Sequence, residues 1–379
     1  MQLLVCMLKL ILCFIIFIRI LFCHHALANP VMIAGDVIID KTIHYNNVTL
    51  DMRNASFHII NHATLHIENC KIIGTISPHH PQLIKVGDGT LLLNDNTFQL
   101  QSEDIIANPM ISSLYHVIEM VDGNMHIINN TFTINTAYTV GFITTKHNNT
   151  TGLIIRSNAI TNFHGGIMLI NSDNFNIINN TFLKISDGNI FIINGRNGNI
   201  ADNNIFFSGN NNIGDSIDIV DSTDINIINN YVLAGSCYAI VILRGQDILV
   251  MSNHIVSGIT YAIFIKLSLP DINKFIGPYQ FKLQKNKNIK ILKNYFSQNR
   301  YGLTASDVDG LTVQNNIFIQ KFSNAETRKF WTDNDVLLKD IHHLDWQKNR
   351  YKEAYTQNDT DNSSASKFVE FPISGGVVF

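Results

Sequence analysis

One phrase of apolar and polar positions recurs along most of this chain. It has the form Φ-x-Φ-x-x-Asn-x-Φ, where Φ is apolar, with a basic spacing of about 22 residues between copies and insertions in some intervals. Copies occupy Leu91–Phe98, Met125–Phe132, Leu153–Ile160, Phe175–Phe182, Ile225–Val232, Ile248–Ile255, Ile289–Phe296 and Leu311–Phe318. Gly198–Ile205 fits with glycine in the first apolar place, and Leu65–Ile72 fits with Cys70 in the asparagine place. A repeat of this length predicts a solenoid whose units pack on their neighbours.

The repeated segments have the pattern of strands. Their apolar residues alternate over short runs that end at Asn, Gly or Asp, and no helical period of about 3.6 residues runs through them. A second apolar run precedes the phrase in four consecutive coils, at Ile167, Ile190, Ile217 and Ile240, and a third follows each asparagine. Three short strands per coil, repeated about ten times, predict an all-β protein with a right-handed parallel β-helix.

The recurring asparagine is expected to be structural. Asn tolerates left-handed backbone geometry at a tight turn, and its amide can hydrogen-bond to the amides of the coils above and below. Cys70, in the asparagine place of the first copy, would then mark the end of the ladder. The predicted ladder consists of Asn96, Asn130, Asn158, Asn180, Asn203, Asn230, Asn253, Asn294 and Asn316.

The two ends differ from the repeat. Residues 1–28 have the pattern of a signal peptide, with Lys9, an apolar run and Ala-Leu-Ala at Ala26–Ala28 as a cleavage site; an uncleaved membrane anchor is the alternative. Residues 29–322 are expected to form the β-helix, with an N-terminal cap over 31–60 and inserted loops at 101–114 and 267–286. Residues 323–379 are expected to be a helical cap and tail, because apolar residues within Glu326–Tyr355 suit an amphipathic helix.

Composition narrows the function classes. Apolar residues make up 46% of the chain and charged residues 15%, which is typical of a folded protein with a sizeable core. A net charge of −3 argues against broad electrostatic binding of nucleic acid. Only Cys70 and Cys237 lie beyond the signal, and both are expected to be packed thiols. We expect a secreted or periplasmic monomer with no membrane span after signal cleavage.

At about residues 40–320 the chain resembles the pectin-lyase-like β-helix superfamily, and within it the NosD-like, carbohydrate-binding-and-hydrolysis repeat proteins. The resemblance implies that a site would lie on the outer face of the first strand of each coil and on the turn before it. Ile213–Asp218 resembles part of a polygalacturonase catalytic element, with Asp215 at the catalytic aspartate. The likeness ends there, because Gly235–Cys237 lacks the paired aspartates and Gly258–Thr260 lacks the histidine.

Candidate chemistry is concentrated in Gly214–Asp224. Asp221 and Asp224 occupy turn positions, whereas Asp218 points outward among Phe191, Val241 and Phe264, where an apolar setting would raise its pKa. Asp215 supplies the second carboxylate that glycoside hydrolysis requires. Together with carbonyl and amide oxygens, the two could equally hold Ca²⁺, as lyases need; no other cofactor is expected. The predicted substrate-binding residues are Arg244, Lys266, Tyr238, Tyr261 and His164. Tyr238 and Tyr261, with Tyr301 after them, are expected to stack in a file that could hold a sugar.

Three functions remain open from the sequence. The first is binding or processing of a polysaccharide or cell-surface glycan by a lyase, hydrolase or epimerase that uses Asp215 and Asp218. The second is a non-catalytic scaffold that binds a glycan or protein partner, which the largely apolar outer face favours. The third is NosD-like periplasmic metal maturation, for which the outward His and Met residues are scattered over several coils.

Overall fold

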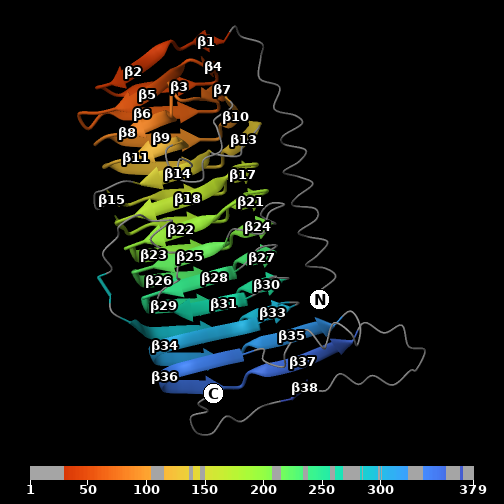
Figure 1. Ribbon diagram of the computed structural model, residues 1–379. Helices are drawn as coiled ribbons and strands as arrows, with labels where there is room; N and C mark the ends of the chain where they lie inside the picture. The colour runs from red at the N-terminus through yellow and green to blue at the C-terminus, as the bar shows by residue number, and fades with distance from the viewer. Residues whose placement is uncertain are drawn as a thin grey trace.

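The chain forms a tall stack of coils that rises from one end of the molecule to the other (Figure 1). In this computed structural model, the described residues are 30–103, 115–135, 140–145, 150–206, 215–233, 238–256, 261–267, 282–283, 285–297, 299, 301–322, 336–355 and 368–369. Every pair of stacked strands is parallel except the last, in which β38 runs antiparallel to β37. The predicted parallel β-helix is therefore the fold of the protein.

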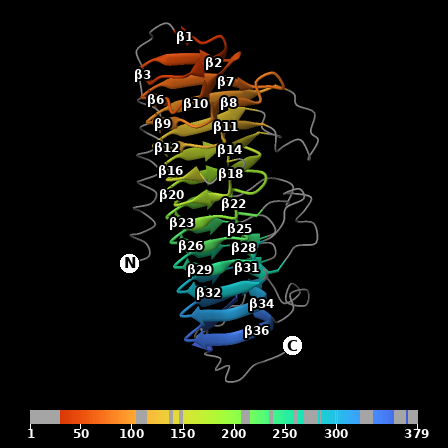
Figure 2. The ribbon, with the colours of Figure 1, turned by 90° about the vertical axis from the view of Figure 1, so that its left-hand side faces the viewer.

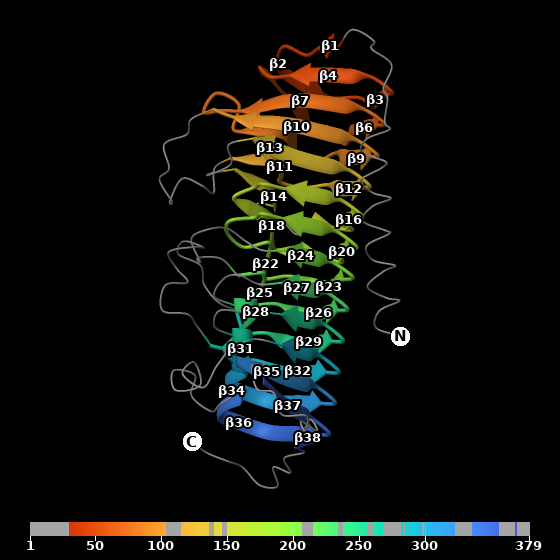
Figure 3. The ribbon, with the colours of Figure 1, turned by 90° about the vertical axis from the view of Figure 1, so that its right-hand side faces the viewer.

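Each coil contributes strands to three faces. Figure 2 shows the first and second faces side by side, and Figure 3 the third. The first face contains β2 (Gly35–Ile39), β5 (Ala55–Ile59), β8 (Gln82–Val86), β11 (His116–Met120), β14 (Gly141–Thr145), β18 (Gly165–Ile170), β22 (Ile190–Ile193), β25 (Ile217–Val220), β28 (Tyr238–Leu243), β31 (Tyr261–Lys266), and the first parts of β34 (Tyr301–Gln314) and β36 (Val336–Gln347).

The second face begins where the chain bends after the first. It contains β3 (Ile43–Asn46), β6 (Thr64–Glu68), β9 (Thr90–Asn94), β12 (Asn124–Ile128), β15 (Thr150–Thr151), β16 (Ile154–Arg156), β19 (Ser172–Asp173), β20 (Asn176–Ile178), β23 (Arg196–Ala201), β26 (Thr223–Ile228), β29 (Gln246–Met251), β32 (Asn286–Leu292) and the later parts of β34 and β36.

The third face is a 14-stranded sheet. It contains β1 (Val31–Met32), β4 (Thr49–Met52), β7 (Lys71–Ile76), β10 (Thr97–Ser102), β13 (Thr131–Asn135), β17 (Ala159–Thr161), β21 (Thr181–Leu183), β24 (Asn204–Phe206), β27 (Tyr231–Leu233), β30 (His254–Val256), β33 (Tyr295–Ser297), β35 (Ile317–Phe322), β37 (Arg350–Tyr355) and β38 (Phe368–Val369).

The core is a column of inward side chains between the three faces. On the first face Ile167, Ile190, Ile217, Ile240 and Ile263 pair in register from coil to coil, and all are buried. Because side chains alternate along a strand, each inward residue sends its neighbour outward. The sequence alternation thus sets both the buried column and the outward column beside it.

The predicted asparagine ladder is confirmed. In the rung at Asn180, the side-chain oxygen accepts hydrogen bonds from the backbone N–H of Asn158 at 3.0 Å and from its amide at 2.9 Å. The amide of Asn180 donates to the carbonyl of Ile155 at 2.8 Å and to Asn203 at 3.1 Å. The same pattern runs from Asn96 to Asn349, one rung beyond the prediction, and every ladder asparagine is buried.

One detail of the ladder was expected and one was not. Cys70 is buried at its end, where its N–H donates to Asn96 Oδ1 at 2.9 Å. The left-handed residue, however, is the one before each ladder asparagine: Asn179 has φ 57° and Asn229 has φ 55°. The prediction that the ladder residue itself adopts this geometry is therefore wrong. The turn residue faces solvent, and the next residue turns its amide inward.

The prediction of a C-terminal helix is wrong wherever the structure describes Glu326–Tyr355, because β36 and β37 continue the stack as strands. The apolar residues of β36 repeat those of β34 in register: Leu303 pairs with Val336, Ala305 with Leu338, Val308 with Ile341, Leu311 with Leu344 and Val313 with Trp346. Left-handed corners at Asp340 and His343 shift the alternation. At these corners the inward residues are three apart in the sequence, as in Leu338, Ile341 and Leu344. This spacing resembles that of the apolar face of a helix.

Several expectations lie outside the described residues. These are the signal at residues 1–28, Cys237, nearly all of the insertion at 101–114, most of the insertion at 267–286, and most of the tail. The described part of the chain contains no helix with the length and apolar character needed to cross a membrane.

A rung of the ladder should be costly to remove. Asn180→Ala leaves the N–H of Asn158 and the carbonyl of Ile155 buried without their partner, so we expect the free energy of unfolding to fall by about 2–4 kcal/mol. Asn176→Ala, at a half-exposed position that accepts one bond from Asn199, should cost less than about 1 kcal/mol. Urea denaturation followed by circular dichroism measures both. Equal losses in the two variants would contradict a structural role for the ladder.

Candidate active site

A column of outward side chains crosses the first face and carries the candidate chemistry. Met168, Phe191, Asp218, Val241 and Phe264 follow one another in register. Phe191, Val241 and Phe264 accompany Asp218 in this column, as the sequence predicts, and Thr144 precedes Met168. Asp218 is therefore a carboxyl group between two apolar neighbours, as expected.

Asp215 and Asp218 form a dyad. Their side chains share a hydrogen bond, and Asp215 Oδ1 also accepts the N–H of Tyr238 at 3.1 Å. The two residues lie on one coil: Asp215 is on the turn that enters β25 and Asp218 is on the strand itself. Both keep part of their surface exposed. The structure thus brings together the two carboxyl groups that the sequence selects, in contact with each other and half-buried.

The dyad holds protons at unusually high pH. Burial raises the pKa of Asp215 to about 7, with a further rise from the charge of Asp187, against the hydrogen bonds from Asp218 and Tyr238. Burial raises the pKa of Asp218 well above its ordinary value, and the charges of Asp215 and Asp187 raise it further. Two carboxyl groups in contact cannot both ionise cheaply. The pair therefore retains a proton at neutral pH.

Asp187 is a third carboxyl group that the sequence analysis does not select. It lies on the preceding coil, where its Oδ2 is 3.8 Å from His164 Nε2 and its N–H donates to the His164 carbonyl. Burial raises the pKa of Asp187, and His164 opposes that rise. A Cβ on the adjacent Gly188 would lie 3.6 Å from Asp218 Oδ2, so the two coils meet closely here. The signal for Asp187 in the sequence is its place on the turn that enters a first-face strand.

Aromatic rings continue the site toward the C-terminal coils. Tyr238 and Tyr261 stack with their centroids 5.2 Å apart, and Tyr261 and Tyr301 stack at 4.8 Å. Phe264 touches both of the first two rings, at 4.9 and 5.2 Å. The predicted file of tyrosines is present, and it begins at the residue whose N–H binds Asp215. Beside it lies an outer apolar cluster formed by Ile193, Val220, Val241, Leu243 and Phe264.

The two predicted cations lie away from the dyad. Arg244 directly follows β28, three residues after Val241, the residue that pairs with Asp218. Its guanidinium donates to the carbonyls of Leu267 at 2.9 Å and Leu283 at 3.3 Å. Lys266 is exposed at the end of β31, with its amine 5.8 Å from the centre of the Phe264 ring. Arg244 therefore contacts the two described ends of the inserted loop, and Lys266 remains near the aromatic file.

Asp221 and Asp224 are turn residues, as expected. Both have left-handed backbone geometry, with φ of 51° and 55°. Asp221 has a further structural contact, because its carboxylate accepts the N–H groups of Lys282 and Leu283 at 2.7 and 2.6 Å. Together with Arg244 it attaches the returning end of the loop to the first face.

The aspartates do not by themselves fit Ca²⁺. Over the part of the chain that the structure describes, one group places three ligand atoms of His, Cys, Asp or Glu within 4.8 Å of one another, and it is not this one. The hydrogen bond within the dyad also requires a proton where a cation would require ionised oxygens.

Comparison with known proteins agrees with this architecture. A family model described as "Right handed beta helix region" matches residues 165–331, which include the dyad, Asp187 and the tyrosine file. The protein is a right-handed parallel β-helix. No curated protein matches the sequence of this β-helix.

Three solved structures illustrate the likeness in fold. A periplasmic alginate epimerase is 12% identical, with 86% of this chain and 85% of that chain covered and a TM-score of 0.46. A mutant DFA-IIIase from Arthrobacter chlorophenolicus A6, bound to DFA-III, is 12% identical over 80% and 85%, with a TM-score of 0.47. A PL6 alginate lyase in complex with a trisaccharide is 14% identical over 89% and 86%, with a TM-score of 0.37.

The dyad should make the β-helix less stable as pH rises. Because the pKa values of Asp215 and Asp218 are raised on folding, the folded protein keeps protons that the unfolded chain releases. Their contribution is most favourable below the ordinary pKa near 3.8 and is lost as pH rises toward 7 and beyond. Asp218→Asn should therefore melt higher than the wild type at pH 8, by on the order of a few degrees, with a smaller difference at pH 4.

Asp224→Asn at an exposed left-handed turn is the matched control, since Asn also accepts that geometry. Melting temperatures of the three proteins from pH 4 to 8 measure the effect. A difference between Asp218→Asn and wild type that does not change with pH would contradict the raised pKa.

Proposed function

We propose that the protein binds a polysaccharide along the first face and hydrolyses it at the Asp215–Asp218 dyad. The observation that carries the proposal is the dyad itself, a hydrogen-bonded pair of carboxyl groups that retains a proton at neutral pH beside a half-buried aromatic file. A carboxyl group that is still protonated at neutral pH is suited to act as a general acid. Stacked tyrosines suit the apolar faces of sugar rings.

The geometry supports separate roles for the three aspartates. Glycosidases place the acid and the second carboxylate about 5–9.5 Å apart across the scissile bond. Two carboxyl groups that share a hydrogen bond are closer than that, so the dyad acts as one unit. We assign proton delivery to the glycosidic oxygen to the dyad, and activation of water to Asp187. His164 beside Asp187 holds its carboxylate in place and opposes the effect of burial on its pKa.

The charge distribution favours a neutral glycan over a uronate. Proton abstraction next to a sugar carboxylate, as in a lyase or epimerase, requires cations that neutralise the developing negative charge. The first face offers three aspartates there, while Arg244 is engaged with the inserted loop and Lys266 lies at the far end of β31. A polyanion would be repelled from the dyad. Hydrolysis of a neutral polysaccharide is the reaction that these residues support best.

A binding function without catalysis is the second candidate, and the tyrosine file supports it. Tyr238, Tyr261 and Tyr301 form a continuous aromatic row, with or without a reaction at the dyad. Periplasmic or extracellular location remains part of the proposal, because it depends on the predicted signal at residues 1–28.

The test is cleavage of a panel of neutral and acidic polysaccharides, followed by new reducing ends and by the absorbance of unsaturated sugars. We expect reducing ends from a neutral polymer without unsaturated products. Asp218→Asn and Asp187→Asn should each lower kcat by at least about a hundredfold, the usual contribution of general acid–base catalysis, and Asp224→Asn should leave it unchanged. The activity of the wild type should fall at alkaline pH as the dyad loses its protons, at a pH well above the ordinary range of a carboxyl group, because the pKa values of both aspartates are raised.

The outcomes separate the candidates. Binding without cleavage, weakened in Tyr261→Ala, would leave a glycan-binding scaffold. Unsaturated products from an acidic polymer would replace hydrolysis with elimination. Cleavage that persists in Asp218→Asn would remove the dyad from the mechanism.

A further inference from the structure

A second cluster of chemically active side chains lies far from the dyad, on the second face near the N-terminal end of the stack. It consists of His44 on β3 and His66 and Glu68 on β6. The two strands pair in register, His44 with His66 and Asn46 with Glu68. Side chains alternate along a strand, so residues two apart lie on the same face. All three side chains therefore point outward from two adjacent coils.

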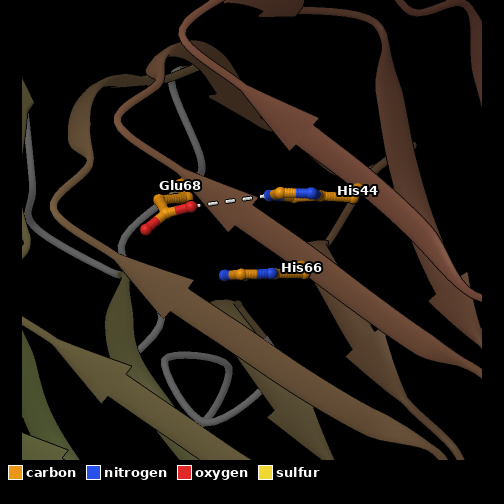
Figure 4. Close-up of side chains that lie close together, drawn as sticks. All are labelled: His44, His66 and Glu68. Carbon is orange, nitrogen blue, oxygen red and sulfur yellow. Dashed lines mark ion pairs between the residues drawn. The ribbon is translucent and has the colours of Figure 1, made fainter.

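The three side chains converge. His44 and His66 stack with their ring centroids 4.3 Å apart and their planes within 5° of parallel. His44 Nε2 lies 3.6 Å from Glu68 Oε2. Figure 4 shows the two rings one above the other with the Glu68 carboxylate beside them. One ligand atom from each residue lies within 4.8 Å of the other two, and within the described ranges no other group of three such residues does so.

An ordinary ion pair does not account for the whole cluster. Glu68 interacts with His44, but His66 is held by a different contact, with Asn94 Nδ2 lying 3.1 Å from its Nε2. An amide nitrogen can only donate, so in this arrangement the lone pair of His66 Nε2 accepts from Asn94. A metal bound by that nitrogen would take the lone pair over from the Asn94 amide.

The ligand chemistry selects a class of ion. Two imidazoles and one carboxylate suit Zn²⁺ and its neighbours among the transition metals, whereas Ca²⁺ takes oxygen ligands. Zn²⁺ binds nitrogen at about 2.0–2.1 Å, so the side chains must tilt toward one another. That movement is available, because His44 and Glu68 keep 46% and 34% of their side-chain surface exposed. Three protein ligands leave a coordination position for water.

We propose that His44, His66 and Glu68 form a binding site for Zn²⁺ or a similar transition-metal dication that joins the first two coils of the second face. The site is independent of the dyad, which lies on another face and on later coils (Figure 1). Its position suggests a mechanical role. The terminal strand β3 has a neighbouring coil on one side within the described second face, and its residues are half-buried or exposed. A metal that bridges β3 and β6 would therefore hold an end of the stack that packing holds weakly.

The experiment is titration of the protein, purified without a histidine tag, with Zn²⁺ by isothermal calorimetry. We expect one site that is lost, or weakened at least roughly tenfold, in His44→Ala, His66→Ala and Glu68→Gln. Ca²⁺ should not compete for it. Zn²⁺ should also raise the melting temperature of the wild type, and the three variants should lose that rise.

His58→Ala is the matched control, an outward histidine on β5, in the coil that contains His66 but on the first face. It should bind Zn²⁺ as the wild type does. Circular dichroism checks that each variant is folded, and Glu68→Gln preserves the shape of the side chain. Absence of a Zn²⁺ site in the folded wild type would overturn the proposal. So would a site that survives in His44→Ala and His66→Ala, or one that is lost in His58→Ala instead.

Discussion

The structure depends on one constraint: no coil can satisfy its own backbone or bury its own apolar side chains. Strands in a parallel stack form their main-chain hydrogen bonds with the coils before and after them, so each coil completes its neighbours. The asparagine ladder meets the same need at the corner between the second and third faces, where the chain turns and strand pairing is interrupted. There the side-chain oxygen of Asn180 accepts the N–H of Asn158, and the pattern repeats coil after coil.

The same constraint separates structure from function on this molecule. Inward positions must hold apolar side chains that pack on the equivalent side chains of the neighbouring coils. The residue type at an outward position is limited only by the residues beside it in the column. The outer face of the first sheet can therefore hold groups that a core would reject. Asp215, Asp218 and Asp187 gather there at a cost in stability, since burial and mutual repulsion raise their pKa values. Residues that destabilise the fold while leaving its repeat intact are characteristic of functional sites.

Stacking also explains why the ends of the molecule behave differently. The coil that contains β3 and β4 has one neighbour on the second face and carries Val48 in the ladder place. The ladder stops one coil before it, at Cys70, whose N–H still donates to Asn96 Oδ1 while its thiol donates to the Glu68 carbonyl. At the other end β36 repeats the inward positions of β34, so the solenoid extends past the point where the asparagine phrase becomes hard to recognise. Corners at Asp340 and His343 shift the alternation there, and a strand with two corners acquires the spacing of a helix.

The sequence by itself determined the repeat, the parallel β-helix, the inward column, the asparagine ladder, and the outward row that contains Asp218. These features depend on alternation within a strand and on one spacing between coils, and both are local patterns. The tyrosine file could be predicted for the same reason, because Tyr238, Tyr261 and Tyr301 occupy equivalent positions in successive coils. Only the tertiary structure placed Asp187 beside the dyad and paired it with His164, attached Arg244 to the inserted loop, and brought His44, His66 and Glu68 together. Those contacts depend on turns and insertions of unequal length and on the direction of side chains at the corners. The register of the stacked coils decides both, and a periodic sequence pattern does not contain that information.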